Sequence, residues 1–213
     1  MKTAIILIVL LLCIGTIQAQ QKIEKHISFS GKESLAMNIQ IADSIDLHTW
    51  NKNEIFVTAS ININENKDND AYLTSFDDKG NSVVIKSNFK ENYFKGRNNC
   101  CIKSQIYWEV YMPEKTNFSL ETIDANITIN GKTEKMKVKS ISGYIDLAVP
   151  PTRGADLEFS TISGTIYSNH DINMTASHSG IPSSVKGKLN NGGSQIDLET
   201  ISGDIFFRKS DIN

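Results

Sequence analysis

The side chains that could do chemistry in this sequence are histidines, serines and carboxylates, and their spacing indicates no catalytic site. His26, His48, His170 and His178 are scattered and match no known triad or metal-ligand pattern. Serine recurs in a Ser-Gly pair that is written several times, whereas a nucleophile needs one activated copy with a base in reach. We therefore predict that the chain is not an enzyme and has no catalytic residues.

Carboxylates suggest two alternatives, a cation site and a catalytic acid pair. An acidic loop contains Asp68, Asp70, Asp77 and Asp78 but lacks the spacing and glycine of an EF-hand loop, which favours a solvated hairpin tip. A glycan-cleaving β-helix enzyme would need two carboxylates at a fixed separation, and it remains the least favoured alternative. The acids later in the chain fall mostly at outward strand positions: Glu121, Asp146, Glu158, Asp197, Glu199 and Asp204. The sequence predicts no metal and no cofactor.

The first 19 residues resemble a secretory signal peptide. Lys2 precedes an apolar stretch over 4–14, and a small residue, Ala19, ends the segment where cleavage is expected. The apolar stretch is shorter than the roughly 20 residues of a membrane span. Lipidation of Cys13 is a less favoured alternative, because Leu12 stands where lipoprotein signals have a small residue. We expect export to the periplasm, the cell surface or the medium, with no integral span in the mature chain.

Composition excludes a nucleic-acid partner. The whole chain has 22 basic and 24 acidic residues and a pI near 6.1, and loss of Lys2 with the signal leaves a net charge of −3. Binding to nucleic acid would need a basic face or a pI above about 9. The remaining cysteines, Cys100 and Cys101, are adjacent, so a disulfide between them would be strained, and two thiols on opposite strand faces are favoured.

Apolar residues alternate with polar ones along most of the mature chain. Such alternation occurs over 35–41, 45–47, 55–63, 83–85 and 106–112, separated by turn-rich segments. A period of two is typical of strands with one buried face. The sequence therefore predicts an all-β protein.

A six-residue phrase then recurs with Ile, Gly and Ile in register. Copies occupy 140–145, 161–166 and 200–205, and a variant with Asp124-Ala125 in place of Ser-Gly stands at 122–127. The central isoleucines, at 123, 141, 162 and 201, are separated by 18, 21 and 39 residues, and a degraded copy lies at 177–181 within the long gap. Repeats of this length are typical of stacked arrays. We predict a β-solenoid with a period near 20 and five such rungs, the alternative being an antiparallel β-sandwich.

Within each rung, a bend near Thr122 is expected to turn the central isoleucine inward. Glycine is suited to a corner or to close backbone approach. Stacking then places Ile123, Ile141, Ile162 and Ile201 in one interior file, and Ile127, Ile145, Ile166 and Ile205 in a second.

Outward aromatic residues on the rungs are the candidate binding face. We assign Tyr144, Tyr167 and Phe206 to it, with an envelope glycan or a protein as the expected partner. For Phe206 and Phe207 the alternative is that they cap the last coil, which an exposed solenoid end requires. A structural or stress-related envelope protein without a ligand is the alternative function, and the oligomeric state stays open.

The strand IYWEVYMP at 106–113, the rungs of T/S-I-S-G-x-I, and IDLHTWNKNEIFVTASI at 45–61 resemble the DUF4097 family of bacterial envelope proteins and candidate adhesins. The resemblance runs from about Leu35 to Arg208. It implies a right-handed, single-stranded β-helix with an adhesion-like role and no catalytic residues. The expected organisation is a signal peptide at 1–19, an N-terminal segment at 20–34 and a solenoid domain at 35–213. Within that domain, irregular rungs occupy 35–113 and S-G-x-I rungs occupy 114–213.

Overall fold

The computed structural model describes residues 20–95 and 102–210, which form sixteen strands of one connected sheet and a short 3-10 turn at Asn69–Ala71. The predicted all-β, solenoid-like fold is confirmed. The predicted signal peptide and Cys13, Cys100 and Cys101 lie outside the described residues. The described part of the chain contains no helix with the length and hydropathy of a membrane span.

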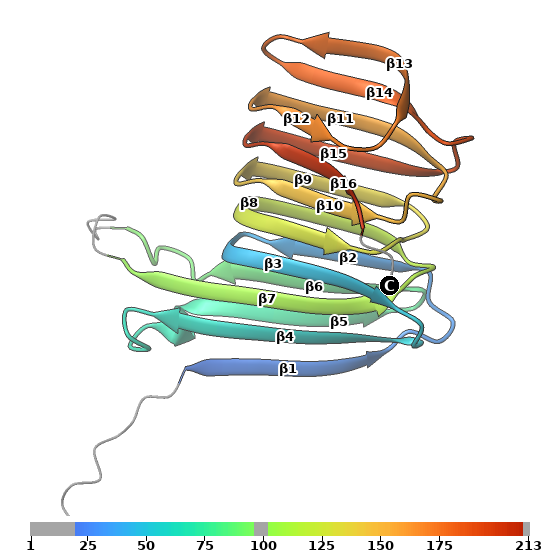
Figure 1. The fold of residues 1–213 in the computed structure, drawn as a ribbon. Helices are drawn as coiled ribbons and strands as arrows, with labels where there is room; N and C mark the ends of the chain where they lie inside the picture. The colour runs from blue at the N-terminus through green and yellow to red at the C-terminus, as the bar shows by residue number, and fades with distance from the viewer. Residues whose placement is uncertain (1–19, 96–101, 211–213) are drawn as a thin grey trace, which may run out of the picture.

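The strands form two sides of a stack (Figure 1). The strands are β1 Gln21–Ser28, β2 Ser34–Ile39, β3 Ile41–Trp50, β4 Glu54–Ile63, β5 Tyr72–Lys79, β6 Ser82–Phe89, β7 Ser104–Pro113, β8 Asn117–Asn130, β9 Met136–Ser142, β10 Ile145–Val149, β11 Ala155–Ser163, β12 Ile166–Ser168, β13 Ile172–Ser179, β14 Ser183–Leu189, β15 Ser194–Ser202 and β16 Ile205–Lys209.

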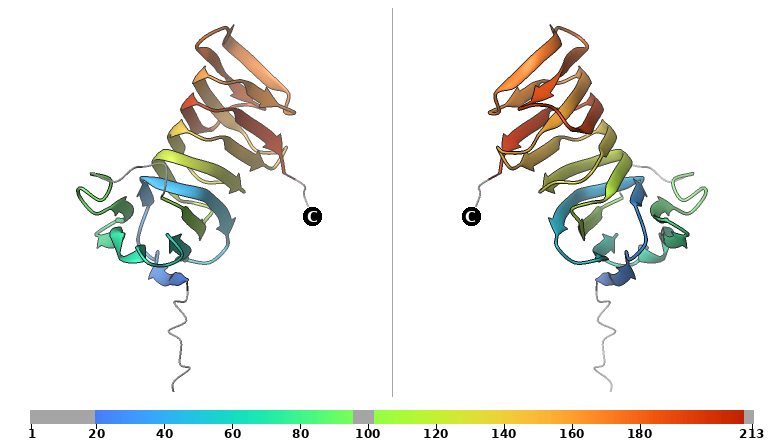
Figure 2. Two further views of the ribbon diagram at one scale, coloured as in Figure 1. Left: turned by 90° about the vertical axis from the view of Figure 1, so that its left-hand side faces the viewer. Right: turned by 90° about the vertical axis from the view of Figure 1, so that its right-hand side faces the viewer.

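We call one side the front sheet, with strand order β1-β4-β7-β3-β8-β10-β16-β12. The other side, the rear sheet, has the order β5-β6-β2-β8-β9-β15-β11-β14-β13. The long strand β8 runs through both sheets, and the pairs β2–β3, β9–β10, β15–β16 and β11–β12 each pass from rear to front across a corner. Viewed from its two sides, the stack shows the two sheets facing each other across the core (Figure 2).

The repeat region stacks in parallel, but its rungs do not follow chain order. β9 pairs with β8 and β15, and β15 pairs with β9 and β11, all in parallel. On the front sheet β16 lies between β10 and β12. The rung that is last in the sequence is therefore inserted below the rung formed by β11 and β12.

The expected fifth rung is replaced by a hairpin at the end of the rear sheet. The degraded copy at 177–181 belongs to the end of β13 and the turn before β14, which pair antiparallel with each other. β14 in turn pairs antiparallel with β11. The prediction of a parallel rung there was wrong. The segment has no second strand to return to the front sheet, so it closes the rear edge instead.

Of the two predicted isoleucine files, one is interior and one is not. Ile127, Ile145 and Ile205 are fully buried, and Ile166 packs against the core. The prediction for the other file was wrong, because its four members are 42–50% exposed: Ile123, Ile141, Ile162 and Ile201. Alternation continues unbroken through Thr122, which faces inward, so the next residue faces solvent.

Glycine is required at the corners by the close approach of neighbouring rungs. A Cβ built on Gly203 would lie 2.0 Å from the carbonyl oxygen of Gly143, and one on Gly164 would lie 2.0 Å from that of Gly203. Gly143 also adopts a φ of +90°, which side chains disfavour. The stacked glycines let each corner nest against the next, which explains why Ser-Gly is repeated.

The core lies between the two sheets and consists of their inward side chains. Trp108, Phe159 and Phe207 are among its largest fully buried members. The alternative that Phe206 and Phe207 cap the last coil was wrong, because β16 lies inside the stack, with Phe207 in the core and Phe206 on the opposite face.

Candidate functional site

The three aromatic residues assigned to a binding face come together on the front sheet. Phe206 of β16 and Tyr167 of β12 are register partners, with ring centroids 5.2 Å apart and planes 10° apart. Tyr144, just before β10, meets Phe206 edge-on, with 6.2 Å between ring centroids. We call these three residues the aromatic ladder. Their role in binding stays a prediction, but strand order explains why residues from three rungs meet.

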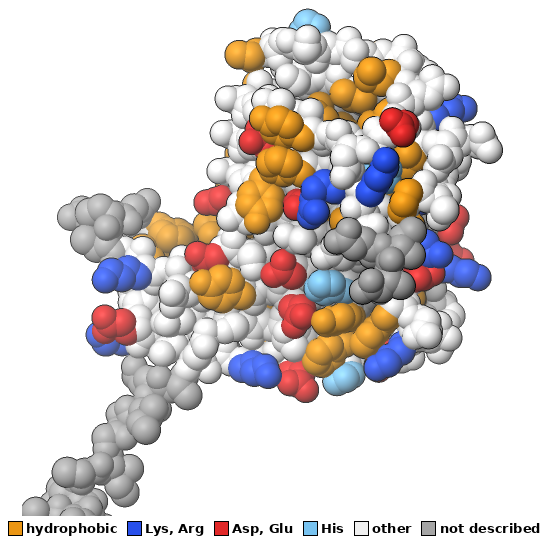
Figure 3. Space-filling model, in the orientation of Figure 1, with side chains coloured by type: hydrophobic (Ala, Val, Ile, Leu, Met, Phe, Trp, Pro, Cys, Tyr) orange, Lys and Arg blue, Asp and Glu red, His pale blue; other side chains and the backbone are white. Residues whose placement is uncertain are grey.

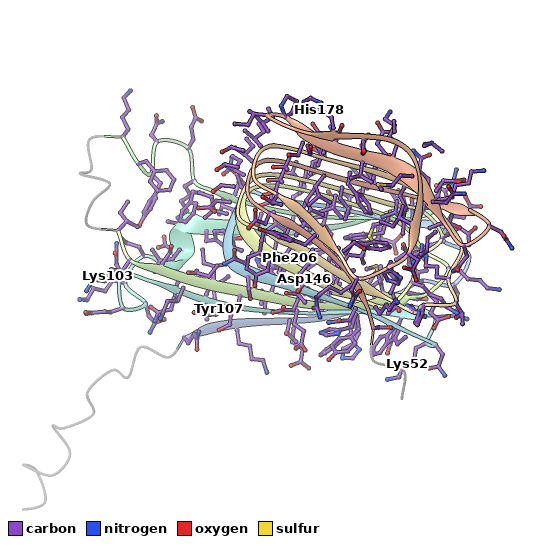
Figure 4. All side chains as sticks on the ribbon, turned by 45° about the horizontal axis from the view of Figure 1, so that its top comes forward. Lys52, Lys103, Tyr107, Asp146, His178 and Phe206 are labelled. Carbon is purple, nitrogen blue, oxygen red and sulfur yellow. The ribbon has the colours of Figure 1, made fainter. Side chains whose placement is uncertain are left out.

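The aromatic ladder is accessible from solvent. Tyr144 is 38% exposed and Tyr167 is 49% exposed. Figure 3 shows hydrophobic side chains in a file over the front of the upper stack. Beside the ladder, Arg208 donates two hydrogen bonds to the Asp146 carboxylate, at 2.6 and 2.7 Å, and Figure 4 shows Asp146 near Phe206. The surface thus combines rings, phenol hydroxyls and a fixed ion pair.

A second aromatic group on the front sheet was not predicted from the sequence. It joins β1, β3, β4 and β7, and we call it the aromatic cluster: His26, His48, Trp50, Phe56 and Tyr111. His48 stacks on Tyr111, with ring centroids 4.8 Å apart, and Trp50 lies 5.2 Å from Tyr111 between ring centroids. In Figure 3 this cluster is the lower hydrophobic patch beside the histidines. Strand parity could have revealed it, because its members alternate with buried residues such as Leu47 and Ile55.

Local hydrogen bonds hold the aromatic cluster in place. The Trp50 indole N–H donates to the Glu54 carbonyl oxygen at 2.8 Å, and Lys52 Nζ lies 4.4 Å from the centroid of the Trp50 ring. The Tyr111 hydroxyl donates to the Glu109 carboxylate at 2.9 Å, and this hydrogen bond, with the negative charge, raises the pKa of Tyr111. The aromatic cluster is therefore an ordered patch in which the Lys52 ammonium group lies over the Trp50 ring.

The rear sheet presents a different surface, in which charges pair across strands. Lys139 pairs with Glu199, and Lys186 pairs with Glu158 at 2.6 Å. Exposed pairs of this kind contribute little to stability, but they leave a solvated and self-compensated face. Two of the carboxylates considered for glycan cleavage, Glu158 on β11 and Glu199 on β15, are among these paired groups.

The isoleucine file that was predicted to be interior borders a groove on the rear sheet. The groove has a volume of about 460 Å³, and its lining includes Ile123, Ile141 and Ile201 together with Glu121 and Lys139. The isoleucines are adjacent across parallel rungs, so each one covers its neighbours. Contact along the file therefore explains the repetition of isoleucine.

The acids of the early loop are held by other side chains rather than by one another. Asp70 pairs with Lys90 at 2.7 Å, and Asp78 pairs with Lys32 at 2.5 Å. Asp68 accepts hydrogen bonds from the Asn64 amide at 2.6 Å and from the Tyr93 hydroxyl at 3.0 Å. These contacts link Asp70 to the end of β6 and Asp78 to the segment between β1 and β2.

His170 is buried, and no pattern in the sequence predicted its burial. Its ring stacks on Phe207, with centroids 4.5 Å apart, and among the described residues its Nε2 has no hydrogen-bond partner. Burial lowers the pKa of His170, and Lys209 lowers it further, against the opposing effects of a backbone hydrogen bond to Arg208 and of Asp171. The neutral form is thus favoured in the folded state.

We predict that the upper stack loses stability on acidification through His170. Because its folded pKa lies below that of the unfolded chain, the unfolded chain binds more protons as pH falls through about 6.5. The stability that neutral His170 contributes is fully present above about pH 6.5 and is lost as the pH falls further. Thermal midpoints measured between about pH 7.5 and pH 5 should fall less in His170→Gln than in the parent. His178→Gln, on the exposed edge strand β13, is the control, and an equal fall in parent and His170→Gln would contradict the assignment.

Comparisons with known proteins find one family model and several solved structures that are similar to this chain. The family model Toastrack DUF4097 matches residues 118–207, which run from β8 to β16. A solved structure of a candidate cell adhesion protein from Clostridium sporogenes ATCC 15579 has a TM-score of 0.61 at 12% identity. The match covers 90% of this chain and 100% of that one, and it shows a shared fold. No curated protein matches the chain in sequence.

Another solved structure also aligns with this chain over most of its length. It is a candidate adhesin from Bacteroides fragilis NCTC 9343, with 11% identity, coverage of 92% and 100% of the two chains, and a TM-score of 0.23. The match of the family model to the stacked rungs is specific to the segment that contains the repeated phrase. Residues 118–207 of the chain match the Toastrack DUF4097 family model, in agreement with the resemblance found in the sequence.

Proposed function

We propose that this protein is exported and acts in the cell envelope as a non-catalytic binding protein, with the aromatic ladder as its contact surface. The proposal rests on one observation, the difference between the two faces of the stack. Outward positions along the rear rungs contain paired charges, with exposed isoleucines toward the corner, whereas the front rungs present the aromatic residues Tyr144, Phe206 and Tyr167. Exposed aromatic groups of this kind are typical of interaction surfaces.

The similar structure from Clostridium sporogenes is named for cell adhesion, which supports a binding role but identifies no ligand. The expected partner is an envelope glycan or a surface protein. Tyrosine suits either one, because it combines a flat apolar ring with a polar hydroxyl. The predicted signal peptide is consistent with contact outside the cytoplasm.

The proposal predicts that the ladder tyrosines are needed for binding. Residues 20–213 should retain a component of envelope glycan preparations or whole-cell extracts, and the double variant Tyr144→Ala, Tyr167→Ala should lose about 10- to 100-fold in retention. The reason is that truncation removes two exposed rings, which are also the two rings that contact Phe206. Retention is measured by affinity capture, with urea unfolding of each variant alongside.

Lys137→Ala, on the exposed rear face, is the matched control and should retain the partner as the parent does. Equal retention by the double variant and the parent would contradict the role of the ladder. A folded β spectrum with no retention from any preparation would favour a structural envelope protein without a ligand.

A further inference from the structure

A groove separate from the aromatic ladder lies on the lower front sheet. It has a volume of about 470 Å³ and is formed over β1, β4, β7 and β3, with Tyr107, Asp46 and Glu109 among its lining residues. Tyr107 is 44% exposed, and Figure 4 shows it on the outer side of β7. The groove and the ladder share no residue, so any ligand of the groove is independent of the function proposed above.

Asp46 and Glu109 form a like-charged pair across parallel strands. They are direct register partners on β3 and β7. Ser44 Oγ donates to Asp46 at 3.1 Å, and the hydroxyls of Tyr111 and Thr58 donate to Glu109 at 2.9 and 3.5 Å. Within the described residues, neither carboxylate forms an ion pair. Like charges placed directly opposite each other destabilise a sheet, so this pair costs stability in the free protein.

The rear sheet shows how the same arrangement is neutralised. Glu158 and Asp197 are also register partners, but Lys186 Nζ lies 2.6 Å from the Glu158 carboxylate. Of the residues that line the groove, only Lys22 is cationic, and its Nζ lies 3.6 Å from the Glu24 carboxylate instead. Asp46 and Glu109 therefore lack the cation that their counterpart on the rear sheet has.

Aromatic side chains on this sheet also accept a positive charge. Lys52 Nζ lies 4.4 Å from the centroid of the Trp50 ring. Tyr107 presents an exposed ring beside the two carboxylates, and a ring face attracts ammonium and guanidinium groups. Negative charge and an accessible ring thus occur together in the groove.

We propose that the groove binds a basic, extended segment of a partner protein, with a lysine or arginine side chain inserted between Asp46, Glu109 and Tyr107. The negative charge of the groove favours a cationic ligand. The groove crosses several strands, which favours an extended polypeptide, because small-molecule sites usually bury most of their ligand. The inserted cation would form the ion pairs that the two carboxylates lack.

The test uses residues 20–213 and a labelled peptide of alternating arginine and serine. Binding measured by fluorescence anisotropy should weaken as salt rises and should fall at least about tenfold in Asp46→Asn and in Glu109→Gln. Both variants should also melt about 1–3 °C higher than the parent without peptide, because the repulsion is removed. Weaker peptide binding together with a higher thermal midpoint would indicate a ligand site rather than a structural role for these carboxylates.

Two control variants and a comparison with spermidine keep the outcomes distinct. Glu158→Gln removes one negative charge from the rear sheet and should bind the peptide as the parent does. The ladder variant Tyr144→Ala, Tyr167→Ala should also bind it normally, so this proposal and the ladder function can fail separately. Equal loss in Glu158→Gln, no peptide binding by the parent, or spermidine binding as tight as the peptide would overturn the proposed polypeptide site.

Discussion

Gly203→Ala is expected to lower the free energy of unfolding by about 3–5 kcal/mol, which is at the upper end for single substitutions. The new Cβ would lie 2.0 Å from the carbonyl oxygen of Gly143 and 2.8 Å from its carbon. Both atoms belong to backbone in the neighbouring rung, so no flexible side chain can move aside. The corner would have to open, which would disturb the parallel pairing of β16 with β10 and β12.

Urea unfolding followed by far-UV circular dichroism measures this effect, and Gly31→Ala is the matched control. Gly31 has a φ of +73° but nothing within 4 Å of an added Cβ, so it tests backbone strain without a clash. Its cost should be about 1–2 kcal/mol. If Gly203→Ala cost no more than Gly31→Ala, close nesting of the corners would be disproved.

Phe207→Ala should cost about 3–5 kcal/mol, whereas Phe206→Ala, one residue earlier, should cost about 1 kcal/mol. Phe207 is fully buried, and its ring centroid lies 5.2 Å from that of Phe159 and 4.5 Å from that of His170. Its removal leaves a cavity inside the stack. Phe206 points outward and loses mainly its contact with Tyr167.

The same two variants should have opposite effects on partner retention. Phe206→Ala should stay folded and lose partner retention, because it removes the centre of the aromatic ladder. Phe207→Ala should retain the partner under conditions where it is still folded. Thermal midpoints and affinity capture give both readouts, and similar costs of unfolding for the two substitutions would contradict the strand parity of β16.

The repeated phrase predicted the stacked fold but not the direction of every side chain. The register of Ile127 and Ile145 and the need for glycine followed from spacing alone. Ile123 was placed inward because the parity shift was assumed at Thr122, whereas the shift follows two outward residues, Ile123 and Asp124. At the inward corner position, Thr161 Oγ1 donates to the Gly203 carbonyl oxygen of the neighbouring rung at 2.9 Å, whereas the equivalent Thr200 hydroxyl has no partner among the described residues.

The order of the rungs could not be predicted from the sequence. The four copies are nearly equivalent, so any copy can pair with any other, and the sequence predicts a degraded fifth rung within the 39-residue step. The structure instead uses that length for the hairpin β13–β14 and returns β15 beside β9. Pairing between distant segments of nearly equal sequence cannot be predicted from the residues of any one segment.

The candidate site was predicted in part. Tyr144, Tyr167 and Phe206 were found because they stand at outward positions of the repeats. The aromatic cluster was missed because its members belong to strands outside the repeats, although His48 and Trp50 also stand at outward positions. The acidic pair of Asp46 and Glu109 depends on β3 lying beside β7, a pairing between segments about 60 residues apart that no motif indicates.

Covalent footprinting of residues 20–213, with and without the retained envelope component, tests the binding account most directly. The account predicts that protection on binding is confined to the front sheet and includes Tyr144, Tyr167 and Phe206. The charged residues of the rear sheet, such as Lys137 and Glu158, should react equally in both states. Protection of the rear sheet with the ladder left reactive would contradict the account.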